Sequence, residues 1–284
     1  MIAVTGASGH CGRLLAEELA RRGEPMRLLV RDPARAPDLP GATPVHADYG
    51  DPGSVAAALE PGDRVFMVSL HEGPARRVPL HRSFIEAAAS RDVAHIVYLS
   101  FVAAGPNAIF LHARSHGATE AMLAESGVPF TAMRNGMYAD DVAGWFDPDG
   151  VAREPAGDGR IAFSYRPELA EAIAVTLTEP GHEGRVYNVV GEPVGLAELA
   201  EIASDVTGCE YRYEPAPVED WVERWRARGS EDWGIEAGLS TFEAQAAGEF
   251  DVVSDDFRAL TGGAPLTIGE VMARHLDEMP LTSA

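Results

Sequence analysis

The feature that most constrains this chain is a glycine-rich turn between a short apolar run and a helical pattern. Residues 5–12 read Thr-Gly-Ala-Ser-Gly-His-Cys-Gly and follow the apolar Ile2–Val4. Gly6 is expected to permit a tight turn, Gly9 the approach of backbone N–H groups to a pyrophosphate, and Gly12 close packing of helix on strand. This context predicts a dinucleotide-binding unit, with a chance glycine loop as the alternative.

Apolar runs alternate with helical patterns through residue 134. The predicted strands are Ile2–Val4, Met26–Val30, Thr43–His46, Arg64–Leu70, His95–Ser100 and Phe130–Arg134. The predicted helices between them are Arg13–Arg22, Pro52–Leu59, Val78–Ser90 and Leu111–Ser126. Near-continuous apolar strands separated by helices predict a parallel sheet that is covered on both faces. Right-handed crossovers then give a Rossmann-type, doubly wound α/β fold.

The second half is expected to form a smaller α/β lobe. A loop is predicted at Asp147–Gly159, helices at Glu168–Thr178, Leu196–Thr207, Val218–Arg228, Ser240–Gly248 and Ile268–Met279, and a strand at Arg185–Val190. We expect a Rossmann domain at residues 1–138 and a substrate lobe at residues 139–284, together forming a single unit. The lobe would cover the carboxyl edge of the sheet, where ligands bind in open α/β folds.

The chain contains no lysine, because all 23 basic residues are arginine. This excludes phosphate-loop nucleotidases, Schiff-base and pyridoxal chemistry, and the Tyr-x-x-x-Lys dyad of ordinary short-chain dehydrogenases. The formal net charge of −21 argues against nucleic acid as a partner. Cys11 and Cys209 are too few for a disulfide framework or a cysteine-rich zinc site.

The sequence shows no targeting or membrane signal. No apolar run approaches the roughly 20 residues that a membrane span needs. The first residues lack a basic segment followed by an apolar core, so no secretory signal is expected. A cytoplasmic protein without membrane contact is therefore predicted, and a homo-oligomer stays open.

Arginines follow the second predicted strand, where an NAD-specific site carries a carboxylate for the ribose 2′-hydroxyl. Arg31 at the strand tip suits a 2′-phosphate, with Arg35 as a second contact, and solvated arginines are the alternative. Asp32 lies next to the tip and leaves NAD(H) open, so NADP(H) is preferred but not required. Asp48 and Tyr49 follow the third strand, where adenine would lie, and a surface loop is the alternative.

A set of segments spread over most of the chain carries a family resemblance. They are Thr5–Gly12, Val30–Asp32, Ala47–Tyr49, Arg76–Arg77 with His81–Arg82, His95–Ser100, Arg134–Tyr138, Gly181–Tyr187 and Leu196–Gly208. Together they resemble the NmrA-like atypical short-chain dehydrogenase/reductase family, and in particular its type 2 NAD(P)H:quinone oxidoreductase branch. The resemblance is loosest at about Ala139–Gly157 and after Pro217. The family holds reductases, isomerase-like members, redox-sensing regulators and tailoring enzymes of aromatic natural products.

The resemblance implies cofactor contacts at several strand ends. They are Gly6, Ser8, Gly9, His10, Cys11, Gly12, Arg31, Ser69, Leu70, Ser100, Phe101 and, near the nicotinamide, Arg134, Asn135 and Gly136. The fourth, fifth and sixth predicted strands also end at one crevice of such a sheet, which agrees with these positions. His71 lies just beyond the fourth strand and is a substrate contact or an exposed turn histidine.

Two histidines four residues apart share one face of the predicted helix Leu111–Ser126. Related isoflavone-reductase-like enzymes carry a lysine on this helix, and counting back from Gly127–Thr131 places His116 at that position. A histidine can donate a hydrogen bond to a nicotinamide ribose or a substrate carbonyl and can act as an acid. We therefore take His116 as the catalytic candidate and His112 as a substrate contact, with packed histidines as the alternative. No metal is expected, because the pair lacks the glutamate of a His-Glu-x-x-His pattern.

Aromatic and methionine side chains follow the sixth predicted strand. They are Met137, Tyr138, Trp145 and Phe146. They suit a flat apolar substrate such as a quinone, and a contact between lid and core is the alternative. Hydride would pass from the nicotinamide to this acceptor, while His116 or Asn135 stabilises negative charge on its oxygen.

Three functions follow from these features. The first is an NAD(P)H-dependent oxidoreductase that reduces a quinone or conjugated aromatic carbonyl. The second is a non-catalytic NADP-binding redox sensor or regulator, which the missing tyrosine–lysine pair motivates. The third is an aromatic polyketide tailoring enzyme that oxidises a quinol in a monooxygenase-type reaction.

Overall fold

The computed structural model describes residues 1–281 and confirms the doubly wound sheet. Its strands are β1 (Ile2–Thr5), β2 (Met26–Val30), β3 (Ala42–His46), β4 (Arg64–Met67), β5 (His95–Phe101), β6 (Phe130–Asn135) and β11 (Val186–Val189). They lie in the order β3-β2-β1-β4-β5-β6-β11, and every neighbouring pair is parallel. The order reverses between β1 and β4, and ligands bind at such a reversal.

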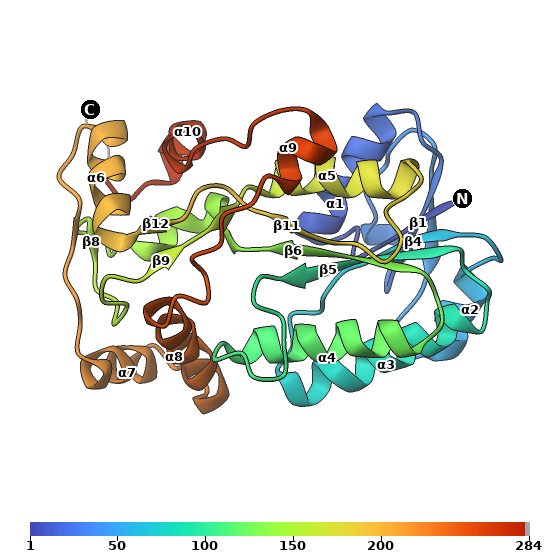
Figure 1. Ribbon diagram of the computed structural model, residues 1–284, viewed down its shortest axis with the longest axis horizontal. Coiled ribbons are helices and arrows are strands. Elements are labelled where there is room, and N and C mark those ends of the chain that lie inside the picture. Colours follow the sequence, from blue (N-terminus) through green and yellow to red (C-terminus); the bar gives the residue numbers. More distant parts are fainter. Residues whose placement is uncertain (282–284) are drawn as a thin grey trace.

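Helices cover both faces of the sheet (Figure 1). On one face lie α1 (His10–Arg21), α5 (Arg166–Thr178) and α9 (Asp256–Thr261), and on the other lie α2 (Pro52–Ala58), α3 (Pro74–Ala89) and α4 (Leu111–Glu125). Leu15 and Ile173 belong to the apolar core of the first face, and Phe84 and Leu123 to that of the second. β5 is buried along its whole length, as expected for a central strand covered on both sides.

Several predicted boundaries differ from the observed ones. β4 ends at Met67 instead of Leu70, and residues 68–73 form a loop. α3 begins at Pro74, four residues earlier than predicted, because proline is well tolerated in the first turn, where its missing N–H costs nothing. α8 (Asp232–Ala246) begins eight residues before the predicted Ser240. The short helix α9 was not predicted.

The second half of the chain completes the nucleotide-binding domain as well as forming a lobe. α5 packs against α1, and β11 pairs with β6. The predicted division after Tyr138 therefore does not separate two bodies. The physical reason is that β6 would otherwise be an unpaired edge of the sheet.

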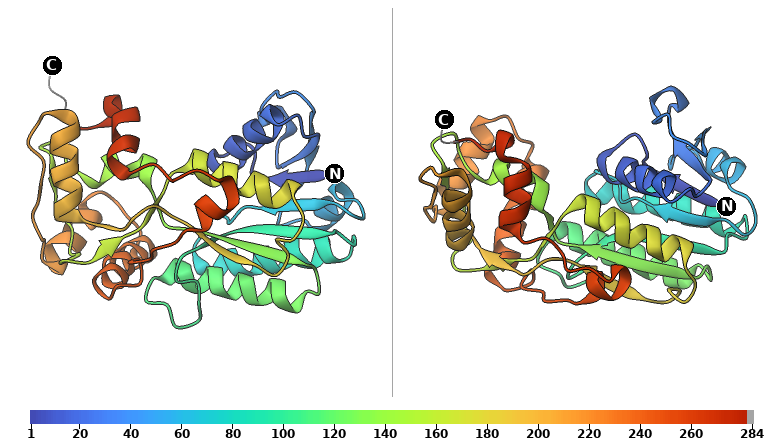
Figure 2. Two further views of the ribbon diagram at one scale, coloured as in Figure 1. Left: turned by 45° about the horizontal axis from the view of Figure 1, so that its top comes forward. Right: turned by 90° about the horizontal axis from the view of Figure 1, so that it is seen from above.

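The remaining elements form a smaller lobe beyond the carboxyl ends of the strands (Figure 2). They are β7 (Met137–Tyr138), η2 (Ala139–Trp145), β8 (Val151–Ala152), β9 (Arg160–Ile161), β10 (Phe163–Ser164), β12 (Val194–Gly195), α6 (Leu196–Thr207), β13 (Arg212–Tyr213), α7 (Val218–Ala227), α8, α10 (Ile268–Arg274) and η3 (Leu276–Glu278). Short two-stranded pairings join β7 to β10, β9 to β12 and β8 to β13. Within residues 1–281, no helix has the length and apolar character needed to cross a membrane.

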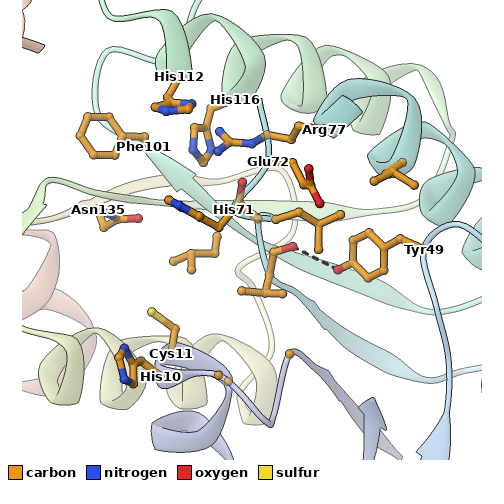
Figure 3. Close-up of a pocket in the computed structure, with 18 of the residues that line it drawn as sticks. His10, Cys11, Tyr49, His71, Glu72, Arg77, Phe101, His112, His116 and Asn135 are labelled. Carbon is orange, nitrogen blue, oxygen red and sulfur yellow. Dashed lines mark hydrogen bonds between the residues drawn. The ribbon is translucent and has the colours of Figure 1, made fainter. Parts of the chain in front are cut away.

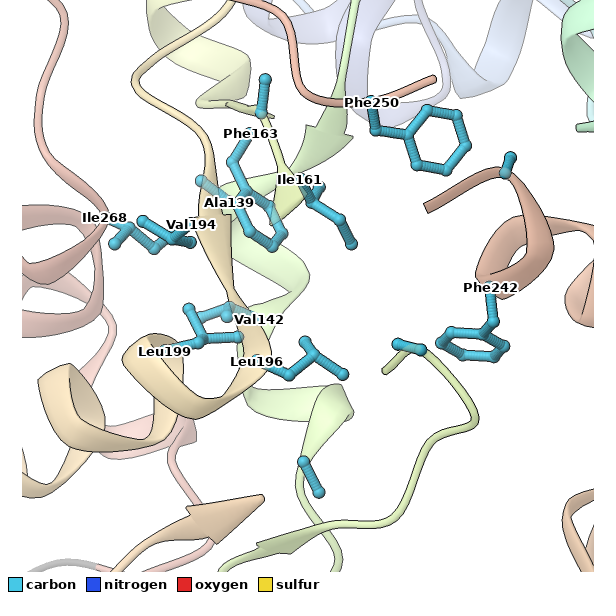
Figure 4. Packing of buried hydrophobic residues seen from close by; sticks show 14 of the residues in the cluster. Ala139, Val142, Ile161, Phe163, Val194, Leu196, Leu199, Phe242, Phe250 and Ile268 are labelled. Atoms are coloured by element: carbon cyan, nitrogen blue, oxygen red, sulfur yellow. The ribbon is translucent and has the colours of Figure 1, made fainter. Parts of the chain in front are cut away.

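The lobe has its own apolar core (Figure 4), in which Leu196 and Leu199 of α6 lie near Val142. Trp145 and Phe146, which were expected beside a substrate, pack into this core instead. The Trp145 ring lies 5.9 Å from the ring of Phe163, and Phe146 makes an edge contact with Tyr211 at 4.8 Å. The helical turn η2 directs both side chains away from the sheet edge, so neither lines the cavity described below.

Candidate active site

A cavity of about 960 Å³ lies at the carboxyl ends of the central strands. Its volume is at the upper end of the roughly 300–1,000 Å³ that cofactor and small-molecule sites occupy. It brings together most of the predicted site residues. These are Gly6, Ser8, Gly9, His10, Cys11, Gly12, Arg31, Asp48, Tyr49, Ser69, Leu70, His71, Phe101, His112, His116, Asn135, Gly136, Met137 and Tyr138.

Three predicted cofactor contacts, Ser100, Arg35 and Arg134, do not line the cavity. The guanidinium of Arg134 is instead paired with Glu120 at 2.6 Å. Ser100 is fully buried, and its hydroxyl donates to Glu120 Oε1 at 2.5 Å. Neighbouring residues of a strand face opposite ways, so Leu99 and Phe101 line the cavity while Ser100 does not. Arg35 is exposed in the short helical turn η1 (Pro33–Arg35).

The glycine turn has the geometry that its spacing predicts. Gly6 has a φ of +67°, which favours glycine, and a Cβ there would lie 2.7 Å from Val68 Cγ1. A Cβ on Gly12 would lie 2.3 Å from the carbonyl oxygen of Gly6, so helix and turn pack too closely for any side chain. A Cβ on Gly9 would meet only the Gly6 oxygen, at 3.4 Å, and would otherwise project into open space.

This open turn suits a pyrophosphate. Gly9 caps α1 without a side-chain hydrogen bond, so the first N–H groups of the helix keep no side-chain partner there. Those N–H groups and the positive end of the helix dipole favour an anion. The residues present therefore fit a dinucleotide.

Arg31 lines the cavity at the tip of β2 and is exposed. The neighbouring Asp32 turns away, because its carboxylate accepts the backbone N–H of Ala34 at 3.1 Å and caps η1. A cation and not a carboxylate therefore lines the cavity at the tip of β2, where folds of this kind hold the ribose 2′ group, and this favours a 2′-phosphate.

His116 is buried, 7% exposed, and its Nδ1 lies 2.9 Å from the hydroxyl of Tyr98. Burial raises the pKa of Tyr98 to about 12, so this hydroxyl keeps its proton. Burial, helped by the positive charge of Arg77, holds the pKa of His116 well below its usual value. With Tyr98 donating to Nδ1 of a neutral imidazole, we assign the ring proton to Nε2, which is left to donate to a ligand.

A second buried histidine holds the wall of the cavity. His81 Nδ1 lies 2.9 Å from Thr119 Oγ1, and its Nε2 accepts the backbone N–H of Leu70 at 3.2 Å. Burial lowers the pKa of His81 to about 3, which leaves it neutral in both hydrogen bonds. His81 thus anchors the loop after β4 to α4.

One wall of the cavity contains an arginine, Arg166, that no sequence motif singled out. The Arg166 guanidinium lies 3.9 Å above the ring of Tyr138, and Asp140 and Asp141 both form ion pairs with it. Cys11 Sγ lies 3.6 Å from the Tyr138 hydroxyl. Arg166 belongs to α5 and to no motif, so only packing of α5 beside the glycine turn could reveal it.

Other lining residues also lacked an assigned role in the sequence. Among them are Glu72, Arg76, Arg77, Leu80, Leu99 and Phe110. The predicted donor Asn135 is buried, and its side-chain N–H already donates to the Gly136 oxygen at 2.6 Å. Gly136 is required by packing, because a Cβ would lie 2.0 Å from the Ala162 oxygen. Within residues 1–281, no three His, Cys, Asp or Glu side chains gather closely enough to hold a metal ion.

Comparison with known proteins agrees with this geometry. Residues 6–180 match a family described as NAD(P)H-binding. Quinone oxidoreductase 2 of Escherichia coli is 34% identical, with 97% of this chain and 98% of the relative covered. A (4-alkanoyl-5-oxo-2,5-dihydrofuran-3-yl)methyl phosphate reductase of Streptomyces griseus is 32% identical, with 98% of each chain covered.

Solved structures agree as well. The crystal structure of the NADPH-dependent E. coli quinone oxidoreductase, complexed with NADPH, has a TM-score of 0.89 at 31% identity and covers 98% of this chain and 100% of its own. The sequence match and the shared fold both extend over nearly the whole chain. An NmrA-like family domain-containing oxidoreductase of Aspergillus flavus is also 30% identical, with 82% of this chain and 80% of the relative covered. The chain therefore belongs to the NAD(P)H-binding family and is an NmrA-like, NAD(P)H-dependent oxidoreductase.

Proposed function

We propose that this oxidoreductase uses NADPH to reduce quinones and related conjugated aromatic carbonyls. The observation that carries the proposal is a neutral histidine, His116, in the part of the cavity across from the glycine turn. Leu99, Phe101 and Phe110 give the cavity apolar lining as well. The names of both curated relatives support the proposal, since a quinone and an unsaturated lactone are each conjugated hydride acceptors.

In such a reaction, different residues of the cavity would bind the cofactor and stabilise the acceptor. NADPH, when bound, supplies a hydride, and a quinone that takes up this hydride and one proton becomes a hydroquinone. The glycine turn and α1 would hold the pyrophosphate, and Arg31 the 2′-phosphate. His116 would donate from Nε2 to the acceptor oxygen as negative charge develops on it. Because His116 is neutral and its pKa is low, the proton that completes the hydroquinone would come from water and not from the imidazole.

The direct test is turnover of purified protein with NADPH and a panel of quinones. We expect NADPH absorbance to fall with one NADPH consumed per quinone reduced. If no quinone in a broad panel is reduced, the proposal is wrong. Binding of NADP without oxidation under every acceptor would support a redox sensor instead.

Replacing Arg31 with alanine is expected to weaken NADPH binding about tenfold or more while NADH binding changes little. A charge-assisted hydrogen bond to a phosphate contributes roughly 1.5–3 kcal/mol, and NADH has no 2′-phosphate to lose. Fluorescence titration of both cofactors measures this. Arg35→Ala removes the same charge from an exposed residue outside the cavity and serves as the control. Equal losses for the two cofactors in Arg31→Ala would contradict the assignment.

The value of kcat/KM for a neutral quinone is expected to stay level between about pH 5.5 and 8. Burial holds the pKa of His116 well below its usual value and lowers that of His112 to about 4, so both stay neutral near neutral pH. Arg77 and Arg134 face His116 and lower its pKa further. The two histidines become protonated only as the pH falls toward these pKa values, so any loss of kcat/KM is expected at acid pH. A break near pH 6.5 that disappears in His116→Gln would contradict the neutral assignment.

A further inference from the structure

Arg77 is a buried cation that lines the cavity and has no carboxylate partner in the described part of the chain. Its side chain comes from α3, and the residue is 5% exposed. Nη1 donates to Ser115 Oγ at 3.1 Å, while Nε is buried without a hydrogen-bond partner. Within residues 1–281, no carboxylate oxygen lies within 4.0 Å of its nitrogens. A guanidinium remains charged in proteins, so the cavity wall carries an uncompensated positive charge.

Burial of Arg77 without a carboxylate partner lowers the stability of the fold. Burying an ion without a partner is strongly unfavourable, and one hydroxyl acceptor compensates little of that cost. Arg77 also lies in the first turn of α3, where the helix dipole is positive and disfavours a cation. The neighbouring acid Glu72 is engaged by Arg76 at 3.3 Å. A charge kept at such a cost points to an anion that binds there.

Other polar atoms in the cavity wall also lack a hydrogen-bond partner. Five buried side-chain polar atoms of the described residues have no hydrogen-bond partner. Three of these, Arg77 Nε, His112 Nδ1 and Ser69 Oγ, belong to residues that line this cavity. Native structures pair nearly all such atoms, so the protein by itself leaves the polar part of this wall incompletely hydrogen-bonded.

The other charges of the cavity are already accounted for. Arg166 is paired with two aspartates, Arg76 with Glu72, and Arg31 faces the position proposed for the cofactor phosphate. Figure 3 shows Arg77 beside His116 and near His112, across the cavity from His10 and Cys11 of the glycine turn. Arg77 therefore faces the place of the acceptor and not that of the pyrophosphate.

We propose that the acceptor carries an anionic oxygen group, such as a carboxylate, sulfonate or phosphate, and that Arg77 binds it. The guanidinium offers a planar pair of N–H donors that matches such a group. The proposal rests on the proposed function, because it names the class of acceptor for that same site.

The preference for an anionic group can be tested without turnover, by measuring the binding of two matched ligands that the protein cannot reduce. Naphthoate and naphthamide share one ring system and differ in charge, and each can be titrated calorimetrically into the NADP⁺ complex. The unaltered protein is expected to bind naphthoate at least about tenfold more tightly, as a charged hydrogen bond implies. Equal affinities would overturn the proposal whether or not any quinone is reduced.

Substitutions show which residue causes the preference for naphthoate over naphthamide. Arg77→Met should abolish the preference for naphthoate, Arg77→Lys should keep part of it, and Arg82→Met should keep all of it. Arg82 is an exposed arginine of the same helix outside the cavity, so it controls for net charge. A preference that persists in Arg77→Met would overturn the proposal. So would a loss of NADPH affinity as large as the loss for naphthoate, because Arg77 would then bind the cofactor.

Steady-state kinetics with a charged and a neutral quinone test whether Arg77 acts during the reaction. Relative to the unaltered protein, Arg77→Met should lose about tenfold more kcat/KM with naphthoquinone sulfonate than with naphthoquinone. The comparison of variant with unaltered protein cancels the different reduction potentials of the two quinones. Equal losses would overturn the proposal. Failure to reduce either quinone, with the naphthoate preference intact, would instead contradict the proposed function.

Discussion

Replacing His116 with alanine is expected to lower kcat for quinone reduction at least about tenfold while the dissociation constant for NADPH stays the same. The imidazole is held by Tyr98 at 2.9 Å and is neutral, so it acts by donating one hydrogen bond from Nε2. Such a bond strengthens as charge develops on the acceptor oxygen and thus affects kcat. Initial rates at saturating quinone and a separate NADPH titration measure the two effects. Unchanged turnover would remove His116 from the mechanism.

Two further variants separate the hydrogen bond from packing. His116→Gln keeps an N–H donor and should recover part of the lost kcat. Tyr98→Phe removes the group that sets the proton on Nε2, so kcat should fall although the substituted residue does not touch the acceptor. Because His116 also packs near Phe101, at 6.0 Å between ring centres, thermal unfolding of each variant checks that the fold is intact.

Replacing Gly12 with alanine is expected to lower the free energy of unfolding by about 1–3 kcal/mol and to abolish tight NADPH binding. The added Cβ would lie 2.3 Å from the Gly6 oxygen and 2.7 Å from the Thr5 oxygen. Both are backbone atoms, so the turn itself must move and its N–H groups leave the phosphate position. Urea unfolding and NADPH titration measure the two losses.

Two other glycines provide matched controls. Gly234 lies in α8, where a Cβ would meet nothing within 4 Å, so Gly234→Ala should leave stability equal or raise it by up to about 1 kcal/mol. Gly9→Ala should leave the free energy of unfolding nearly unchanged but weaken NADPH, because its Cβ enters the space at the turn. If the Gly12→Ala variant is as stable as the unaltered protein, the argument that α1 packs too closely on the glycine turn for a side chain is wrong.

The parts of the fold that could be predicted depend on local pattern. Apolar runs separated by amphipathic ones were enough for the parallel sheet and its order, because crossover handedness and strand burial follow general rules. The return of α5 and β11 to the first domain could not be predicted. Their placement depends on which sheet edge and which helix face remain uncovered, and a sequence pattern does not state this.

The candidate site likewise contains residues that could be predicted from local pattern and residues that could not. The glycine turn and Arg31 could be located because each lies directly after a predicted strand. Trp145 and Phe146 were misplaced, since an apolar side chain suits a ligand pocket and a core equally well until the direction of η2 is known. Arg166 was missed for the opposite reason: it is a surface-type residue that packing makes into part of a wall.

By itself, the sequence determined that a dinucleotide binds and that no lysine takes part in the chemistry. Both conclusions follow from residue identity and short spacing, which need no tertiary contact. Only the tertiary structure decided the state of the groups around the position proposed for the acceptor. Tyr98 contacts His116, Arg77 has no carboxylate partner among residues 1–281, and Ser100 faces away, because burial and partners arise where elements distant in the chain pack together. The glycine turn thus predicts the cofactor, and the packing of α3 and α4 against the sheet sets the surroundings of the proposed acceptor position.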